Sequence, residues 1–191
     1  MKGEWCYFKN YFTKETCDKI LEIGLKIEPK ESEIGVEGNN LGTDTKIRRS
    51  KVRFIQSDNI EFQGLFDEVW KIGTTANRDW FNFHITNLSF MQLAEYDESY
   101  QGEYKKHHDV FWINNNKYHR KMSCVIQLSD PASYEGGDLE LYDISDYPNK
   151  AEIKERGSVI FFPSFVTHAA LPVTKGTRYS LTAWFEGNKW Q

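Results

Sequence analysis

The stretch GSVIFFPSFVTHAALPVTKGTRYSLTAWF, residues 157–185, decides the fold class. Within it, apolar runs such as SVIFFP and YSLTAWF are separated by turn-forming residues such as TKG. Similar short runs begin near residue 87, and turn-forming stretches separate them: DESYQGE, NNNK, SDPASYEGG, DYPNK and ERG. Short strands at this spacing are typical of an all-β sandwich or barrel. A jelly roll fits the pattern best, because its two sheets enclose a cavity.

The first third of the chain has a helical pattern instead. Thr13 can cap a helix over residues 14–26. Apolar residues three and four apart give this helix one buried face: Cys17, Ile20, Leu21, Gly24 and Leu25. A second helix is predicted to begin near Asn59, with a similar face: Phe62, Leu65, Phe66, Val69 and Gly73. Between the helices we expect a loop over about 28–45 and an extended segment over 47–55.

Length and composition favour one domain. The chain has 191 residues, so we predict a single domain in which helices in about 1–86 support a β-rich core over about 87–186. The net charge of −4 gives no general attraction to nucleic acid or anionic lipid. No apolar stretch is long enough to cross a membrane, and the N-terminus lacks a signal-peptide pattern. The sequence therefore predicts a soluble, cytoplasmic protein without a membrane partner.

Two residue types set further limits. The three cysteines are far apart and form no CxxC pair, so a disulfide framework or zinc knuckle is not expected, and each should be a small buried hydrophobe. Aromatic residues make up 15% of the chain. Rings at this frequency suit either a β core or the walls of a pocket. Trp112 and Trp184 flank the polar motifs described next, and both uses remain open for them.

A group of polar residues indicates a metal site. On an extended segment, residues two apart point to the same side, so His107 and Asp109 can converge on one cation while His108 points away. His168 follows the apolar run SVIFFPSFVT and offers a third ligand. Two histidines and one carboxylate form the facial triad of non-haem iron(II), which leaves three coordination positions open. Arg178, on the next predicted strand, suits a bidentate grip on a carboxylate.

With these motifs in order, the chain resembles the iron(II)- and 2-oxoglutarate-dependent dioxygenases of the prolyl 4-hydroxylase-like group. The matching pieces are Tyr96, HHD at 107–109, YEGGDLEL at 134–141, GSVIFFPSFVTHAALPV at 157–173 and GTRYSLTAWF at 176–185. They extend over roughly residues 88–186, about half the chain. The resemblance implies a double-stranded β-helix, which is a jelly-roll or cupin-like sandwich, supported by α-helices.

The resemblance also implies roles for single residues. His107, Asp109 and His168 match the iron ligands, and Arg178 matches the residue that binds the distal carboxylate of 2-oxoglutarate. Tyr96 matches a tyrosine that hydrogen-bonds to this cosubstrate.

Two further residues are expected near the cosubstrate. Thr182 shares the strand face of Arg178 and should line the pocket. Gln127 stands where many relatives carry tyrosine; its amide can still donate a hydrogen bond to a carboxylate.

The implied activity is hydroxylation of a prolyl or other amino-acid residue in a peptide or protein, or of a free amino acid. Dioxygen and 2-oxoglutarate are consumed, succinate and carbon dioxide are released, and ascorbate is a candidate reductant. Asp109 favours hydroxylation over halogenation, because related halogenases leave this ligand position free for chloride.

Alternative functions remain open at this point. The basic segment 46–53, which includes Arg53, is either a solvated edge strand or a basic rim at the mouth of the site. A basic rim would suit an acidic peptide, or the phosphates met by a nucleic-acid demethylase of the same fold. However, no second arginine follows Arg178 as in such demethylases, so nucleic acid is not the expected partner. A non-catalytic metal-binding jelly roll is the third possibility, although it would not need the complete triad with its arginine.

Overall fold

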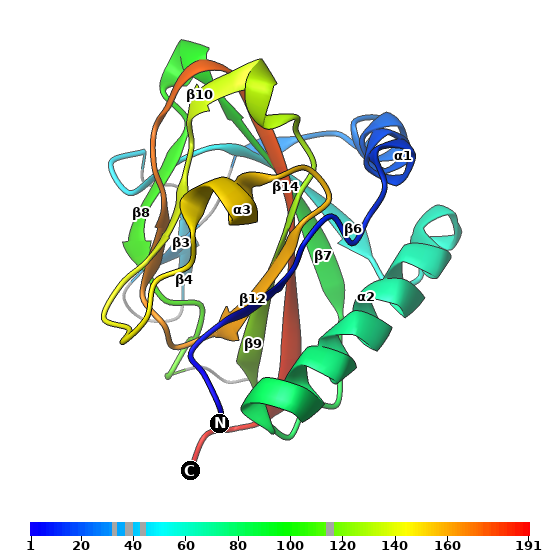
Figure 1. Ribbon diagram of the computed structural model, residues 1–191, viewed down its shortest axis with the longest axis vertical. Coiled ribbons are helices and arrows are strands. Elements are labelled where there is room, and N and C mark those ends of the chain that lie inside the picture. Colours follow the sequence, from blue (N-terminus) through cyan, green and yellow to red (C-terminus); the bar gives the residue numbers. More distant parts are fainter. Residues whose placement is uncertain (32–33, 37–39, 43–44, 114–116) are drawn as a thin grey trace.

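Two antiparallel sheets face each other in the computed structural model, which describes residues 1–31, 34–36, 40–42, 45–113 and 117–191 (Figure 1). The strands of the larger sheet are, in spatial order, β1 (Cys6–Phe8), β12 (Val159–Pro163), β9 (Tyr118–Gln127), β14 (Val173–Asn188), β7 (Phe90–Asp97), β6 (Lys51–Gln56) and β2 (Lys30–Glu31), with β10 (Tyr134–Gly136) paired to β14. The smaller sheet has the order β11 (Leu139–Leu141), β13 (His168–Ala170), β8 (Glu103–His107) and β5 (Arg48–Arg49). The predicted double-stranded β-helix is confirmed.

Helices cover the outer face of the larger sheet. α1 (Lys14–Gly24) and α2 (Gln63–Ala76) lie on the side of this sheet that faces away from β8 and β13 (Figure 1). The remaining helical elements are short: α3 (Lys150–Lys154), η1 (Ile60–Phe62), η2 (Asn77–Phe81), η3 (Glu98–Tyr100) and η4 (Pro131–Ser133).

Local capping explains where both long helices begin. The Thr13 hydroxyl accepts a hydrogen bond from the Thr16 backbone N–H at 3.2 Å, as predicted. The Asn59 side chain caps η1, which continues directly into α2. The predicted face of α1 is wrong at one position, since the helix ends at Gly24 and Leu25 beyond it is 40% exposed.

The segment between the helices contains more strand than expected. Residues 30–31 form β2, and β3 (Ile34–Val36) pairs with β4 (Asn40–Gly42) in a hairpin, so the prediction of a loop over 28–45 is wrong for these residues. The short run IGV supplies one arm of the hairpin. Residues 32–33, 37–39 and 43–44 lie outside the described part of the chain.

Strand alternation divides the larger sheet into two faces. On β14, one set of alternate residues packs toward the helices: Leu181, Ala183 and Phe185. The other set faces the smaller sheet and lines a cavity: Arg178, Ser180, Thr182 and Trp184. The aromatic residues therefore serve both predicted uses, with Phe185 in the core beneath the helices and Trp184 in the cavity wall.

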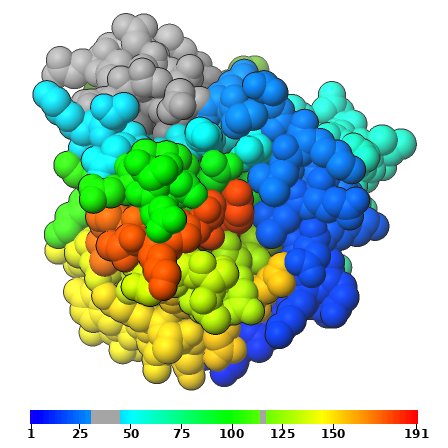
Figure 2. Space-filling model, turned by 90° about the horizontal axis from the view of Figure 1, so that it is seen from above, coloured from blue at the N-terminus to red at the C-terminus, as the bar shows by residue number. Residues whose placement is uncertain are grey.

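The end of β14 that precedes Arg178 is held on both sides. Seen from above, this end (orange) lies between the green η3 region and the yellow-green β10 region (Figure 2). The Gly176 backbone N–H donates to Glu98 Oε2 at 3.0 Å, and Gly176 pairs with Tyr134 of β10. These contacts fix the strand at the point where it enters the cavity.

Two expectations from composition can be compared with the structure. Cys6, Cys17 and Cys124 are buried and free, as predicted. None of the helices in the described ranges combines the length and the apolar character needed to cross a membrane.

Candidate metal centre

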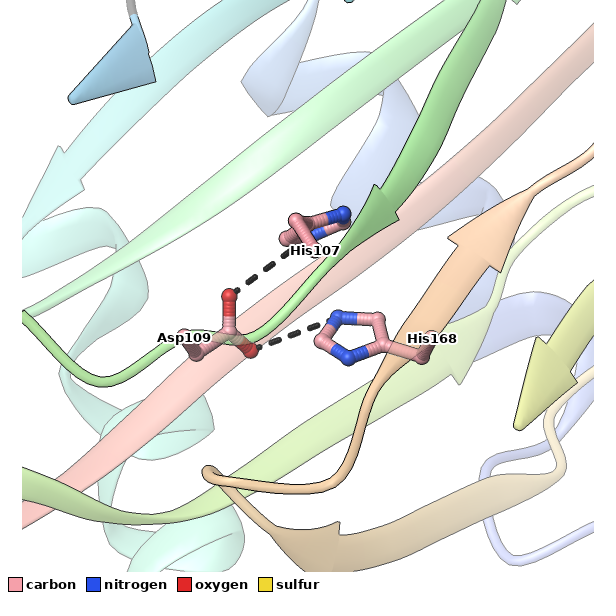
Figure 3. A group of neighbouring side chains, drawn as sticks. All are labelled: His107, Asp109 and His168. Atoms are coloured by element: carbon pink, nitrogen blue, oxygen red, sulfur yellow. Dashed lines mark ion pairs between the residues drawn. The ribbon is translucent and has the colours of Figure 1, made fainter. Parts of the chain in front are cut away.

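Three potential metal ligands converge where β8 and β13 pair in the smaller sheet. His107 is the last residue of β8, Asp109 follows it, and His168 is the first residue of β13, directly paired with His107. Both imidazole rings are directed toward the Asp109 carboxylate (Figure 3). His107 Nε2 lies 3.7 Å from Asp109 Oδ1, and His168 Nε2 lies 3.5 Å from Asp109 Oδ2. One ligand atom from each of the three side chains lies within 4.8 Å of the others.

Backbone contacts orient both imidazoles. His107 Nδ1 lies 2.7 Å from the Lys105 carbonyl oxygen, and His168 Nδ1 lies 3.0 Å from the Val166 carbonyl oxygen. Because a carbonyl oxygen only accepts hydrogen bonds, Nδ1 must carry the proton in each ring. The Nε2 lone pairs are therefore both directed at the space beside Asp109, which is the arrangement that metal-binding histidines use.

Hydrogen bonds from the larger sheet hold the carboxylate. Ser123 Oγ donates to Asp109 Oδ2 at 2.6 Å and lies 2.9 Å from Ser164 Oγ. The Asp109 backbone N–H also donates to the Ser164 carbonyl at 2.8 Å. The carboxylate thus has a fixed direction although it lies just outside β8.

The electrostatics give His107 and Asp109 the protonation states that a cation requires. Burial, reinforced by the charge of His168, lowers the pKa of His107 to about 3. Burial alone would raise the pKa of Asp109, but the neighbouring His168 and His107 outweigh it and hold this pKa below its ordinary value. At neutral pH the site therefore offers a neutral His107 and a charged Asp109. Two imidazoles and a carboxylate with open positions match the donor set of a facial-triad iron(II) site.

The three side chains form one wall of a cavity between the sheets. The cavity is lined by Arg48, Gln92, Tyr96, Tyr104, His107, Asp109, Val125, Leu139, His168, Ala170, Arg178, Ser180, Thr182 and Trp184. Of the residues predicted from the sequence, it contains the proposed ligands together with Tyr96, Arg178, Thr182 and Trp184.

Arg178 is the most deeply buried cation of this cavity, at 2% exposure. Its Nη2 donates to Gln127 Oε1 at 3.0 Å, and its guanidinium carbon lies 5.4 Å from the centre of the Tyr96 ring. The Gln127 amide oxygen is thus used by Arg178, which leaves the amide N–H groups as donors. Gln127 itself lines a smaller neighbouring cavity that Arg178 shares.

Two predicted substrate residues lie elsewhere. Trp112 is 50% exposed and packs edge-on against the rings of His108 and His119, outside the cavity lining. Arg53 lies on the opposite face of the larger sheet, where its Nη1 bonds Glu95 Oε2 at 2.9 Å and its Nε bonds the Ile27 carbonyl. The structure therefore brings neither residue into the cavity lining. For Arg53 the reason is alternation, because Val52 beside it faces the other sheet.

Tyr104 and Arg48 are among the cavity residues that were not predicted. Tyr104 should face away from His107 by simple alternation, but the register shifts between them, since Ala170 pairs with Tyr104 and His168 with His107. The two rings consequently stack with centroids 3.4 Å apart. Arg48 belongs to the basic segment singled out in the sequence. Because the chain changes sheets at Ser50, between β5 and β6, no single alternation extends through that segment.

Comparison with known proteins identifies relatives of the β-rich part of the chain. The PKHD-type hydroxylase of Synechococcus sp. (strain CC9311) is 33% identical over 87 residues, which is 45% of this chain and 37% of that protein. A PKHD-type hydroxylase of Xanthomonas campestris pv. campestris (strain B100) is 29% identical over 106 residues, covering 56% and 38%. The chain thus spans little more than a third of the length of these relatives.

Solved structures share the fold at low sequence identity. A Trichoplax adhaerens prolyl hydroxylase, solved in complex with a hypoxia inducible factor peptide fragment, superposes with a TM-score of 0.72 at 19% identity, covering 96% of this chain and 83% of that one. A viral collagen prolyl hydroxylase from Paramecium Bursaria Chlorella virus-1 gives a TM-score of 0.68 at 17% identity, covering 96% of both chains.

The match to a family model covers the metal centre itself. Residues 91–186, about half of the chain, match the 2OG-Fe(II) oxygenase superfamily. This range contains the His107, Asp109 and His168 cluster and the buried Arg178, and the family name implies Fe(II) and 2-oxoglutarate. The chain therefore belongs to the 2OG-Fe(II) oxygenase superfamily.

Proposed function

We propose that this chain is an Fe(II)- and 2-oxoglutarate-dependent hydroxylase that acts on a prolyl or other amino-acid residue of a peptide or protein. The observation that carries the proposal is one cavity that holds two oriented imidazoles, a charged carboxylate and a buried guanidinium. The relatives named as hydroxylases support the reaction class. The peptide bound to the Trichoplax protein supports the substrate class.

The residues of the centre fit iron and its cosubstrate. His107, Asp109 and His168 would hold Fe(II) through two nitrogens and one oxygen. When bound, iron and 2-oxoglutarate supply the activation of dioxygen for C–H hydroxylation, with succinate and carbon dioxide as co-products. The Asp109 carboxylate offsets part of the metal charge, and Ser123 fixes its direction.

The larger sheet supplies the groups that hold the cosubstrate. Arg178 would grip its distal carboxylate, and the hydrogen bond to Gln127 fixes the plane of the guanidinium. Tyr96 packs beside the guanidinium, and Thr182 lies on the same face of β14. Trp184 lines the cavity on this strand and would exclude water from the substrate's reacting carbon.

Ion pairs within the basic segment disfavour the nucleic-acid alternative. Arg49 pairs with Glu103 at 2.8 Å, and Lys51 and Arg53 both pair with Glu95, at 3.8 and 2.9 Å. Cations already paired with carboxylates offer less to a phosphate backbone.

The buried free thiols support the reducing, cytoplasmic compartment predicted from the sequence.

Metal binding and succinate release together test this function. The purified chain is titrated with Mn(II) and with Fe(II) under anaerobic conditions. It is then exposed to air and supplied with 2-oxoglutarate, ascorbate and a panel of proline-containing peptides. We expect binding of one metal ion per chain and iron-dependent succinate release that a peptide stimulates. His168→Ala should abolish both, because only two ligands remain.

His84→Ala is the matched control, since His84 is an exposed histidine outside the cavity. It should bind metal and release succinate as the unmodified chain does. Succinate release that survives His168→Ala would contradict the proposed function, as would an unmodified chain that neither binds nor consumes 2-oxoglutarate.

A further inference from the structure

A second buried guanidinium faces the cavity from the smaller sheet. Arg48 lies on β5 and is 7% exposed, and its position in the sheet is fixed by pairing with Tyr104 of β8. Its Nε donates to Ser50 Oγ at 2.8 Å. Its guanidinium carbon lies 4.4 Å from the centre of the Tyr104 ring, which in turn stacks on His107. The Tyr104 ring therefore lies between Arg48 and His107 of the candidate metal centre.

This cation differs from its neighbours in having no acidic partner among the described residues. Arg49, Lys51 and Arg53 all pair with glutamates. In the part of the chain that the structure describes, no carboxylate oxygen lies within 4.0 Å of a nitrogen of Arg48. Burying a charge costs free energy unless an opposite charge lies beside it. An anion that binds beside Arg48 would supply that opposite charge and offset the cost.

Arg178 already accounts for the cosubstrate. It lies on β14 in the opposite sheet, where Gln127 and Tyr96 hold it. Beyond its keto-acid end, 2-oxoglutarate has one carboxylate, and one guanidinium satisfies it. Arg48 is thus available for the other reactant.

We propose that Arg48 binds a carboxylate of the primary substrate, so that the enzyme hydroxylates a free amino acid or a peptide residue that has an acidic side chain beside it. The proposal rests on the proposed function and specifies its substrate class. A guanidinium recognises a carboxylate through two parallel hydrogen bonds, and the outer nitrogens of Arg48 are suited to that geometry because Ser50 engages Nε. Either the α-carboxylate of a free amino acid or an acidic side chain beside the target residue in a peptide supplies the group.

Matched pairs of probes separate these sources. The iron-loaded chain is assayed for substrate-stimulated succinate release with L-amino acids and their carboxamides, and with blocked peptides containing Pro-Glu or Pro-Asp and their Gln or Asn counterparts. We expect the carboxylate member of a pair to be preferred by about tenfold to a hundredfold in kcat/KM, the usual effect of a charge-assisted hydrogen bond. Preference within the amino-acid pairs identifies a free substrate, and preference within the peptide pairs identifies an acidic side chain.

Variants assign the preference to Arg48. Arg48→Gln should remove it mainly by raising KM for the carboxylate probe, and Arg48→Lys should retain part of it, because the charge remains without the planar fork. Lys106→Gln is the control, since Lys106 is an exposed cation on the adjoining strand β8. It should leave the preference unchanged. Unstimulated 2-oxoglutarate turnover, measured in every variant, reports folding and cosubstrate binding.

The outcomes distinguish the two proposals. Equal use of carboxylate and amide probes, or a preference that survives Arg48→Gln, overturns the role of Arg48. The absence of carboxylate-selective turnover throughout the panel, with unstimulated turnover intact, also overturns it and leaves the proposed function standing. Loss of 2-oxoglutarate turnover in the unmodified chain rejects the proposed function itself.

Discussion

Single hydrogen bonds decide how well the metal centre is organised. Asp109 lies just beyond the end of β8, so its direction depends on Ser123 of β9 in the opposite sheet. Behind Ser123 stands Ser164, at 2.9 Å between the hydroxyl oxygens. The carboxylate is therefore positioned by the larger sheet, although the histidines beside it belong to the smaller one.

Ser123→Ala tests this dependence. We expect metal affinity to fall roughly tenfold to a hundredfold, because groups that orient ligands typically have effects of this size. Calorimetric titration with Mn(II) measures the change. Ser164→Ala, one hydrogen bond further from the metal, should have a smaller effect. Equal affinities in Ser123→Ala and the unmodified chain would show that Asp109 needs no such support.

The cysteine thiols should be inert in the folded protein. Burial raises the pKa of Cys6 to about 12, and burial raises the pKa of Cys124 well above its ordinary value. Since the thiolate is the reactive form, a thiol-specific disulfide reagent should label neither cysteine at about pH 8 until denaturant is added. Rapid labelling of the native chain, located by mass spectrometry at either residue, would contradict the burial described above.

At the scale of elements, α2 depends on one close approach to β14. A Cβ at Gly73 would lie 2.0 Å from Phe185 Cζ, whereas a Cβ at Gly64 of the same helix meets nothing within 4 Å. We expect Gly73→Ala to lower the free energy of unfolding by about 1–3 kcal/mol through overpacking. Gly64→Ala should raise it by about 0.4–1 kcal/mol, because the unfolded chain loses freedom. Denaturant unfolding of both variants measures the difference.

Features that depend on local contacts could be predicted from the sequence, whereas features that depend on pairing between distant strands could not. Thr13 and Asn59 act on backbone a few residues away, so both helix starts were predictable. His107 and Asp109 follow local alternation, and they meet as expected. Tyr104 and Arg48 depend on a register shift and on a change of sheet at Ser50, which arise from pairing with distant strands. The placement of Arg53 follows alternation along β6, and the sequence does not reveal that the face carrying Val52 is the one toward the cavity.

For the whole molecule, buried acids predict loss of stability at alkaline pH. Burial raises the pKa of Cys6 from its ordinary 9.0 to about 12, and burial raises that of Tyr104 from 10.0 to about 12. Above about pH 9 the unfolded chain releases these protons before the folded chain does, so the free energy of unfolding falls as pH rises. The contribution is complete below pH 9 and is lost as pH passes through about 12.

Denaturant midpoints measured at increasing pH above 9 test this expectation. Cys6→Ala should reduce the slope, because it removes one of the groups whose proton is held more tightly in the folded chain. An unchanged slope in Cys6→Ala would assign the alkaline loss to the other buried acids, such as Cys124 and Tyr104.

The two faces of β14 determine which sequence changes in this strand the fold can tolerate. Thr182 and Ser180 face the cavity, whereas Leu181 and Ala183 pack toward the helices. Point substitutions on the cavity face can therefore alter what the enzyme accepts without disturbing the core, and new specificities are accessible in small steps. A one-residue deletion in this strand would exchange the two faces at once. Laboratory evolution of this chain should thus succeed through substitution libraries and fail through libraries of short insertions or deletions.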